Sequence, residues 1–164
     1  MAPRLLLLCG TAFSGKSTLA RSLAPQLPAS IVSLDQINHR RGLWGGDGIP
    51  ADEWIRTHQL ASEEVRELLA SGTSVIVDDT SSLRFLRDGW RSLAAEAGAR
   101  FTLIYVDVDQ STIRRRRADN QLNPRRRDVA DAVLAQHLAD FEPPEDDEDA
   151  VRVTSIDDLH CVMI

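Results

Sequence analysis

The sequence has no long apolar run, few cysteines and almost no lysine. No stretch approaches the ~20 apolar residues of a membrane-spanning helix, and the four leucines at 5–8 are too few for the apolar part of a secretion signal. Cys9 and Cys161 lack the spacing of a metal or redox motif, and Cys9 is expected to be a buried thiol in a strand. These absences favour a soluble, cytoplasmic protein without a membrane contact.

The basic residues are almost all arginines. Among 19 Lys and Arg residues Lys16 is the single lysine, and 25 Asp and Glu residues give a net charge of −6. A negative chain disfavours a general nucleic-acid binder, because neutralising phosphates requires a basic face, but a local basic site stays open. Lys16 is retained where a compact ammonium is needed in place of a planar guanidinium.

Short apolar segments alternate with segments of helical character. Strands are expected at 4–9, 30–34, 74–77, 100–108 and 150–156. Helices are expected from the loop 10–15 to about 26, and at about 50–70, 83–97, 110–118 and 128–141. Loops are expected at 39–49, 118–127 and 142–149. Because several strands are wholly apolar, the pattern predicts a parallel sheet covered on both faces, in a single domain over residues 1–164.

Several polar residues directly follow the expected strands. In parallel sheets, ligands bind beyond the carboxyl ends of the strands. Gly10, Asp35, the pair Asp78 and Asp79, and Asp107 stand at such ends. They are therefore expected to lie along one rim of the sheet.

Residues 10–18, GTAFSGKST, fit the pattern G-x-x-x-x-G-K-[ST]. Glycines at both ends let the backbone wrap around an anion, and the following helix adds its positive end. In this motif Lys16 reaches the β- and γ-phosphates and the Ser17 hydroxyl ligates Mg²⁺. The nucleotide-binding residues predicted are Gly10, Thr11, Ala12, Phe13, Ser14, Gly15, Lys16, Ser17 and Thr18. A glycine-rich turn with an exposed lysine is the alternative, and the strand before and helix after disfavour it.

Two aspartates are candidates for the second metal-binding group and a third for the base. SVIVDDT places Asp79, the first choice, and Asp78, the second, near the metal or its waters. Asp35 follows the second strand and is the candidate that activates an acceptor hydroxyl. For all three, capping a helix is the alternative role.

Seven arginines fall within residues 113–127. At most one or two of the consecutive helical arginines can face one site. Arg116 from the helix and Arg126 from the loop are selected as the cations on the transferred phosphate. The others are expected to be solvated or to pair with acids such as those of residues 145–149; the alternative is a charged exposed face or an RNA-binding patch.

Four segments together resemble a known group of enzymes. GTAFSGKST, SLDQIN, IVDDT and YVDVDQSTIRRRR with NPRRRDV are similar to P-loop kinases of the polynucleotide 5′-kinase, chloramphenicol phosphotransferase and zeta-toxin type, often grouped as AAA-like small kinases. The resemblance implies a three-layer α/β/α P-loop NTPase fold with sheet order 2-3-1-4-5. It also implies a lid around 118–128, a hydroxyl-activating role for Asp35, and an Asp-Thr pair matched by Asp79 and Thr80. Those kinases often carry an arginine three positions after the acceptor-site aspartate, where this chain has Asn38.

The segment 35–60 is expected to form the acceptor site. It carries Trp44 and Trp54 beside arginines and histidines, which suits a small organic molecule or stacked bases; Trp54 can equally be core. ATP and Mg²⁺ are the expected cofactors. The predicted function is transfer of the γ-phosphate to a hydroxyl of a small molecule. The alternatives are a 5′-hydroxyl polynucleotide kinase and a nucleotide-dependent regulatory ATPase; the partners are thus ATP and a small acceptor, or a nucleic-acid end.

Overall fold

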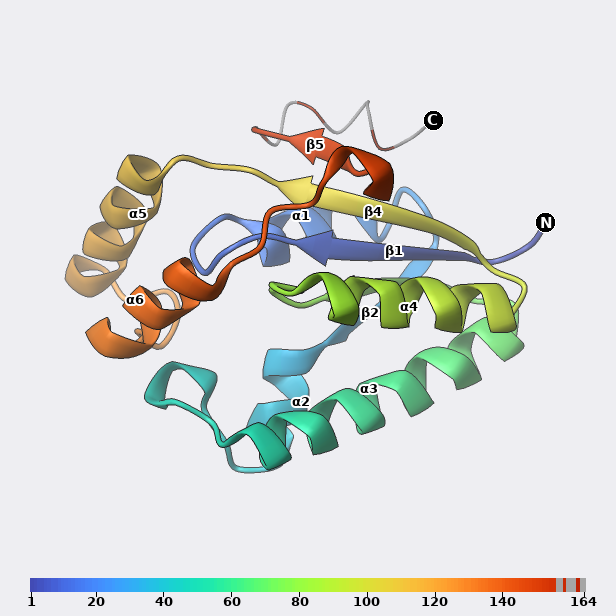
Figure 1. Ribbon diagram of the computed structural model, residues 1–164, viewed down its shortest axis with the longest axis horizontal. Helices are drawn as coiled ribbons and strands as arrows, with labels where there is room; N and C mark the ends of the chain where they lie inside the picture. The colour runs from blue at the N-terminus through green and yellow to red at the C-terminus, as the bar shows by residue number, and fades with distance from the viewer. Residues whose placement is uncertain (156–157, 159–161, 163–164) are drawn as a thin grey trace.

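The computed structural model describes residues 1–155, 158 and 162, and its centre is a parallel sheet of five strands (Figure 1). The strands are β1 (Arg4–Cys9), β2 (Ala29–Ser33), β3 (Ser74–Asp78), β4 (Arg100–Val106) and β5 (Val151–Val153). Their order is β2-β3-β1-β4-β5, and every neighbouring pair is parallel. The predicted α/β fold and strand order are confirmed.

Helices cover both faces of this sheet. The helices of the described chain are α1 (Lys16–Leu23), α2 (Leu34–Arg40), α3 (Ala51–Ala70), α4 (Arg84–Glu96), α5 (Gln110–Leu122) and α6 (Asp131–Asp140), with short 3₁₀ turns η1 (Gly45–Asp47) and η2 (Asp146–Glu148). Side chains of β1 alternate between the two faces. Leu5 and Leu7 pack with α3 and α4, whereas Leu6 and Leu8 pack with α1. All four leucines are fully buried, which is why the first strand is apolar at each position from Leu5 to Cys9.

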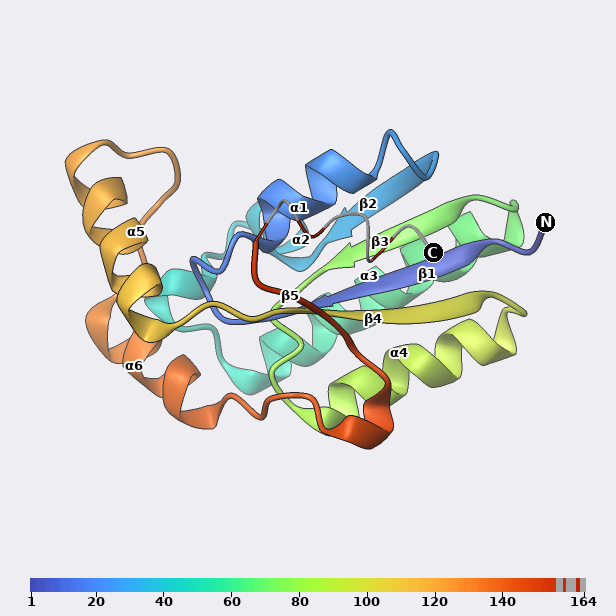
Figure 2. The same ribbon diagram turned by 90° about the horizontal axis from the view of Figure 1, so that it is seen from above.

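A third apolar cluster lies outside the sheet. Phe13 of the phosphate-binding loop packs with Ile113 of α5, Val129, and Leu134 of α6. Figures 1 and 2 show α5 and α6 beyond the carboxyl ends of the strands. Helices α5 and α6 therefore form a hairpin with its own small core against the phosphate-binding loop, and residues 118–128, predicted as a lid, lie at the turn of this hairpin.

Local boundaries differ from the predictions at three places. Residues 34–40, partly assigned to a loop, form α2, because the Ser33 hydroxyl accepts the Gln36 N–H and caps the helix. Helix α5 continues to Leu122, since nothing breaks it before Asn123 and Pro124. Residues 128–130, predicted as helical, precede α6 because Asp128 and the Val129 carbonyl accept hydrogen bonds from Arg117.

The last strand is short. Residues 150–156 are predicted as a strand, and β5 covers Val151–Val153 of them. Residue 156 and Cys161 lie outside the described residues. Within the described part of the chain, no helix has both the length and the apolar character that crossing a membrane requires.

Candidate phosphate-binding and phosphoryl-transfer site

The loop between β1 and α1 has the backbone of an anion cradle. Gly10 has φ +154° and Gly15 has φ +102°, in the region that favours glycine. A Cβ at Gly10 would lie 2.7 Å from the Val106 carbonyl oxygen, so no side chain fits there. The Gly10 N–H donates to the Thr80 carbonyl at 3.0 Å, which joins the loop to the turn after β3.

Two side chains of this loop fit a phosphate ligand. The Ser14 Oγ is buried without a hydrogen-bond partner, so the cradle contains an unsatisfied polar atom. The Lys16 ammonium donates to the Thr11 carbonyl at 2.8 Å and lies within the field of Asp35, Asp78 and Asp79. Burial lowers the pKa of Lys16, and the carboxylates oppose this shift. A phosphate entering the loop would supply the missing partner of Ser14 and an anionic partner for Lys16.

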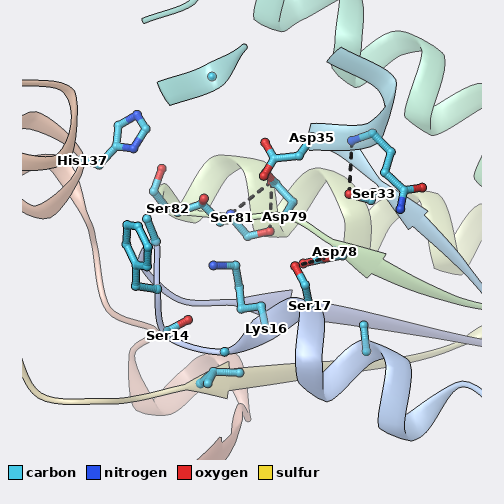
Figure 3. A pocket seen from close by; sticks show the side chains of 18 of the residues that line it. Ser14, Lys16, Ser17, Ser33, Asp35, Asp78, Asp79, Ser81, Ser82 and His137 are labelled. Atoms are coloured by element: carbon cyan, nitrogen blue, oxygen red, sulfur yellow. Dashed lines mark hydrogen bonds between the residues drawn. The ribbon is translucent and has the colours of Figure 1, made fainter. Parts of the chain in front are cut away.

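The two aspartates after β3 make different contacts (Figure 3). The Ser17 hydroxyl donates to Asp78 Oδ2 at 2.7 Å. Asp79 Oδ2 accepts the backbone N–H and the hydroxyl of Ser81, at 3.1 and 3.2 Å. Because a hydroxyl and a carboxylate oxygen side by side suit Mg²⁺, the donor set at Ser17 and Asp78 fits this ion. The hydrogen bonds thus favour Asp78 over Asp79, the reverse of the sequence-based preference.

Asp35 lies in the first turn of α2, and its carboxylate remains open to the cleft. Its Oδ1 is 3.7 Å from a Cβ built at Gly45, and the Trp54 ring borders the same position. The surrounding protein raises the pKa of Asp35 above its usual value, and Arg126 opposes this rise. In Figure 3, Lys16, Asp35 and Asp79 converge on one space. The structure therefore brings the predicted base next to the predicted phosphate site.

The two selected lid arginines both reach the phosphate-binding loop. Arg116 Nη1 donates to the carbonyls of Phe13 and Ser14 at 3.0 and 2.7 Å. The Arg126 guanidinium lies over the Phe13 ring, 4.6 Å from its centroid, and is exposed to the cleft.

The other arginines of 113–127 are exposed or pair with acids, as expected, but the acids are not those of residues 145–149. Arg117 pairs with Asp128 and Asp131, and Arg127 pairs with Asp47. Carboxylates of the acidic segment instead pair with arginines of α4. The reason is proximity: Asp128 and Asp131 lie beside the lid helix in sequence, while the acidic segment runs along α4.

The cleft beside Asp35 has an apolar wall. It has a volume of about 2180 Å³, more than the ~300–1,000 Å³ typical of a pocket for one small ligand. Ile55 of α3 and Phe85 of α4 line it with 60% and 68% of their surfaces exposed. Trp54 lines it too while packing against the core. His58 lies between the Trp54 and Trp90 rings.

No arginine takes the place left by Asn38. Asn38 is fully buried and accepts a hydrogen bond from the Thr57 hydroxyl. Arg41 is held by Thr57 and Glu53, and Arg40 pairs with Glu64 at 3.2 Å. Both guanidinium groups thus have partners on α3 and do not line the cleft.

Two further residues change the list of site residues. His137 of α6 lines the cleft near Asp35, and burial lowers its pKa. His137 was not predicted from the sequence, although it follows the buried Leu134 by one helical turn and should therefore share its face of the helix. Asp107, expected on the same rim, lies outside the cleft, because it pairs with Arg152 and accepts the Tyr105 hydroxyl.

A family model described as the AAA domain matches residues 5–144. Among curated proteins, the chain is 30% identical over 152 residues to the protein KTI12 homologue of Arabidopsis thaliana, a match that covers 86% of this chain and 48% of that protein. It is 35% identical over 103 residues to an uncharacterized protein of Mycobacterium tuberculosis, covering 57% of this chain and 21% of that one. The chain thus spans less than half the length of these curated relatives.

Solved structures of kinases have the same fold. The APS kinase CysC of Mycobacterium tuberculosis, solved with AMPPNP and APS, superposes with a TM-score of 0.72 at 20% identity, covering 99% of both chains. A gluconokinase of Sinorhizobium meliloti gives 0.66 at 17% identity, covering 96% of this chain and 87% of that one. A chain of the Pnkp1/Rnl/Hen1 RNA repair complex gives 0.68 at 24% identity, covering 93% and 50%.

Proposed function

Because the chain belongs to the AAA domain family and has the fold of small P-loop kinases, we propose that it transfers the γ-phosphate of ATP to a hydroxyl of a small molecule. One observation carries this proposal. The phosphate-binding lysine Lys16 and the carboxylate of Asp35 lie in the same cleft, and each contributes to the electrostatic field of the other. A carboxylate at this place can activate either an acceptor hydroxyl or a water molecule, and the exposed apolar wall of the same cleft favours an organic acceptor.

The nucleotide phosphates would lie in the loop 10–18. The N–H groups at the start of α1 point toward this loop, and the buried Ser14 hydroxyl is available to an oxygen. Lys16 would exchange the Thr11 carbonyl for the β- and γ-phosphates. Arg126 is placed to neutralise charge on the transferred group, since its guanidinium rests on Phe13.

Mg²⁺ fits the hydroxyl of Ser17 and the carboxylate of Asp78, 2.7 Å apart. When bound there, the ion would reduce the negative charge of the phosphates that repels the incoming hydroxyl. Asp79 is fixed by Ser81 and lies one residue further along the turn. We assign the metal to Ser17 and Asp78, with Asp79 orienting its waters.

Asp35 would accept the proton of the acceptor hydroxyl. The acceptor oxygen then forms a bond to the γ-phosphorus while the bond from that phosphorus to the β,γ-bridging oxygen breaks, and ADP leaves with the electron pair. The pKa of Asp35 is raised by its surroundings, which makes it a stronger base than an ordinary aspartate. The products are a phosphate ester and ADP, and the proton passes from Asp35 to water.

The walls near Asp35 favour a neutral acceptor with an apolar part. Ile55 and Phe85 offer exposed apolar surface in the cleft. The arginines on this side, Arg40 and Arg41, are paired with carboxylates. Arg66 of α3, which lines the cleft, pairs with Glu96 at 3.9 Å. In the described part of the chain, the cleft arginines without an ion pair are Arg21 of α1 and, on the lid, Arg116, Arg125 and Arg126. A polyanionic acceptor would therefore find little positive charge at the acceptor wall.

A 5′-hydroxyl polynucleotide kinase is the second candidate. It is favoured by the similarity to a chain of an RNA repair complex and by exposed arginines on the lid. Asn38 and the pairing of Arg40 and Arg41 count against it. The third candidate, a regulatory ATPase, has the support of the matched KTI12 homologue, which is about twice as long as the matched stretch.

The test is a transfer assay with ATP and Mg²⁺, read by mass spectrometry. One arm contains a pool of hydroxylated metabolites and antibiotics, and the other a 5′-hydroxyl oligonucleotide. We expect a mass increase of one phosphate on a small molecule. Phosphate on the oligonucleotide would establish the second candidate, and hydrolysis without a modified acceptor in a broad pool would favour the third.

Two variants check the roles. Lys16→Ala is expected to abolish transfer while the fold is retained. Asp35→Asn should bind ATP as before and transfer ~10²–10⁴-fold more slowly, the usual contribution of a general base. In the unaltered protein, kcat/KM should fall with decreasing pH at a pKa above that of an ordinary aspartate, because the raised pKa protonates the base earlier. Full activity in Asp35→Asn would contradict the assignment.

A further inference from the structure

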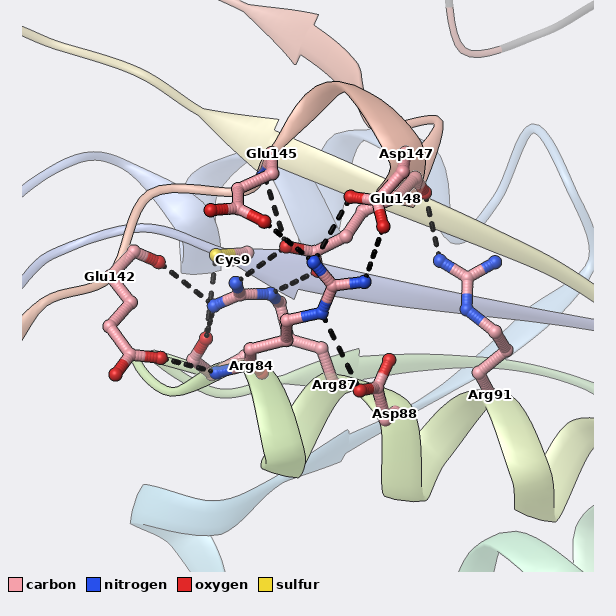
Figure 4. A network of polar contacts seen from close by, with 10 residues as sticks. Cys9, Arg84, Arg87, Asp88, Arg91, Glu142, Glu145, Asp147 and Glu148 are labelled. Carbon is pink, nitrogen blue, oxygen red and sulfur yellow. Dashed lines mark hydrogen bonds and ion pairs between the residues drawn. The ribbon is translucent and has the colours of Figure 1, made fainter.

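Arg87 of α4 is a buried arginine that joins three separate segments (Figure 4). Its side chain and that of Glu148 are each 1% exposed. Nε and Nη2 donate to the two carboxylate oxygens of Glu148, at 2.6 and 2.8 Å. Nη1 donates to the carbonyls of Ser81 and Glu142, at 3.0 and 2.9 Å. One guanidinium thus holds the turn after β3 and both ends of residues 142–148, here called the acidic strap.

The turn that Arg87 holds is conformationally costly. Ser81 is a buried non-glycine residue with φ +48°, in the left-handed region. Such a residue persists only where its surroundings impose the conformation. The Ser81 carbonyl accepts hydrogen bonds from Arg87 and, at 3.5 Å, from the Cys9 thiol. Arg87 is the charged donor among these and supplies the stronger bond.

This turn also fixes two parts of the candidate site. The Ser81 N–H and hydroxyl hold the Asp79 carboxylate. The carbonyl of Thr80 accepts the N–H of Gly10, the first residue of the phosphate-binding loop. A rotation of the turn at Ser81 would therefore move Asp79 and remove the bond that aligns Gly10.

The acidic strap links the same turn to the lid. It begins two residues after α6, and the Glu142 N–H donates to the Ser82 carbonyl at 2.8 Å. Helix α6 carries His137 into the cleft. The strap is held on α4 by Arg84 and Arg91 as well as by Arg87. Among these arginines, Arg87 is the one bonded to both the strap and the Ser81 carbonyl.

We propose that the Arg87–Glu148 pair is a positioning device for phosphoryl transfer: it holds the left-handed turn at Ser81 and so sets the places of Asp79, Gly10 and the base of the lid. Neither residue lines the cleft or touches the nucleotide loop. The kinetic part of this proposal rests on the proposed function. The structural part, control of the turn and the loop, does not.

The test compares two double variants on the same two segments. Arg87→Met with Glu148→Met replaces the buried pair by apolar side chains of similar length, which a fold often tolerates without loss of stability. Arg84→Met with Asp147→Met removes an exposed pair between the same helix and strap, with side chains 39% and 64% exposed and no bond to Ser81. Both proteins are first checked for a thermal midpoint close to that of the unaltered chain.

Amide hydrogen exchange is then measured on peptides covering residues 8–18 and 76–84. These contain the N–H groups of Gly10 and Ser81, whose partners are the Thr80 carbonyl and Asp79. In the Arg87/Glu148 variant we expect at least ~10-fold faster exchange in both peptides, because freed turns open locally. The Arg84/Asp147 variant should exchange like the unaltered chain. Unchanged exchange in both variants would overturn the proposal.

Kinetics provide the second readout. A misplacement of about 1 Å in a catalytic group can cost ~10²-fold in rate. We expect that loss in kcat for the Arg87/Glu148 variant, with KM for ATP changed less than the rate. If the double variant does not fold, Arg87→Lys serves instead: an ammonium can still pair with Glu148 but lacks the fork that reaches two carbonyls as well. It should exchange faster at both peptides, and exchange at the unaltered rate would contradict the proposal.

Failure of the proposed function and failure of the proposed role of Arg87 give different results. If the unaltered protein neither binds nucleotide nor transfers phosphate, the proposed function fails, and the exchange result still decides whether Arg87 controls the turn. If the unaltered protein is active and the Arg87/Glu148 variant keeps both kcat and exchange, the pair has only a stabilising role.

Discussion

Two groups of arginines lie on either side of the cleft, and their surroundings differ. On α4, Arg87 is 1% exposed and all of its partners are protein atoms, a carboxylate and two carbonyls. On the lid, Arg126 is exposed, and its neighbour is the Phe13 ring, with no ion pair to a carboxylate among the described residues. The same side chain is fully satisfied in one place and left available to an anion in the other.

This difference in pairing explains how a chain with a net negative charge can bind phosphate. A guanidinium that already has a carboxylate at close range gains little from a phosphate, because it must give up one charged partner for another. A guanidinium resting on an aromatic ring is oriented without being neutralised. The net charge of −6 therefore says little about the cleft, where pairing decides which arginines remain free.

The largest expected effect comes from breaking the satisfied arginine alone. Arg87→Met leaves Glu148 buried without its partner, and removing one member of a buried pair costs about 3–5 kcal/mol. We expect this loss in the free energy of unfolding, measured by urea titration at pH 7. The double variant with Glu148→Met should recover most of it. Equal instability of the single and double variants would mean that packing, and not the unpaired carboxylate, is responsible.

The next effect concerns the available arginine and should appear in rate without a loss of stability. Arg126→Ala removes the guanidinium over Phe13 and is expected to lower kcat by ~10²–10³-fold, the usual cost of losing one donor to a developing charge. Arg115→Ala is the matched control, because Arg115 is an exposed lid arginine that does not line the cleft. A similar loss in both variants would show that the lid acts through its overall charge.

Much of the difference between the two groups of arginines could not be predicted from the sequence. The strands and the phosphate-binding loop followed from local patterns, since buried parallel strands are apolar and the motif fixes its own backbone. The strand order followed only from the resemblance to P-loop kinases. Arg116 and Arg126 were both selected from seven arginines, and both lie at the loop. Helical periodicity could limit the number of arginines that face one site, whereas the partners of the others depend on contacts distant in sequence.

The features that sequence patterns did not predict share one cause, which is their dependence on contacts between residues distant in sequence. The pairing of Glu148 with Arg87 joins residues 61 positions apart, and nothing in the run EDDED distinguishes a buried glutamate from solvated neighbours. The choice between Asp78 and Asp79 meets the same limit, because the two residues are adjacent at the end of the strand and the contact of Asp78 with Ser17 joins residues 61 positions apart. The contact of His137 with the cleft likewise depends on how α6 packs on the lid.

The smallest expected effect is a difference in acid sensitivity. The hydrogen bonds from Arg87 lower the pKa of Glu148 below its ordinary value of 4.5. A carboxylate whose pKa is lower in the folded than in the unfolded chain adds stability that is present above the unfolded value and is lost as the pH falls through the folded value. The Arg87/Glu148 double variant lacks this contribution, so its free energy of unfolding should decline less between pH 5 and the acid limit.

Urea midpoints measured at several pH values from 7 downward would test this difference. The Arg84/Asp147 double variant is the control: its pair is exposed and screened by solvent, so it should follow the unaltered chain closely. If the Arg87/Glu148 variant instead declines as steeply as the unaltered chain, the acid sensitivity comes from other carboxylates, such as Asp128, whose pKa Arg117 lowers to about 2. That outcome would place the acid-sensitive contact on the lid and reverse the contrast between the two groups of arginines.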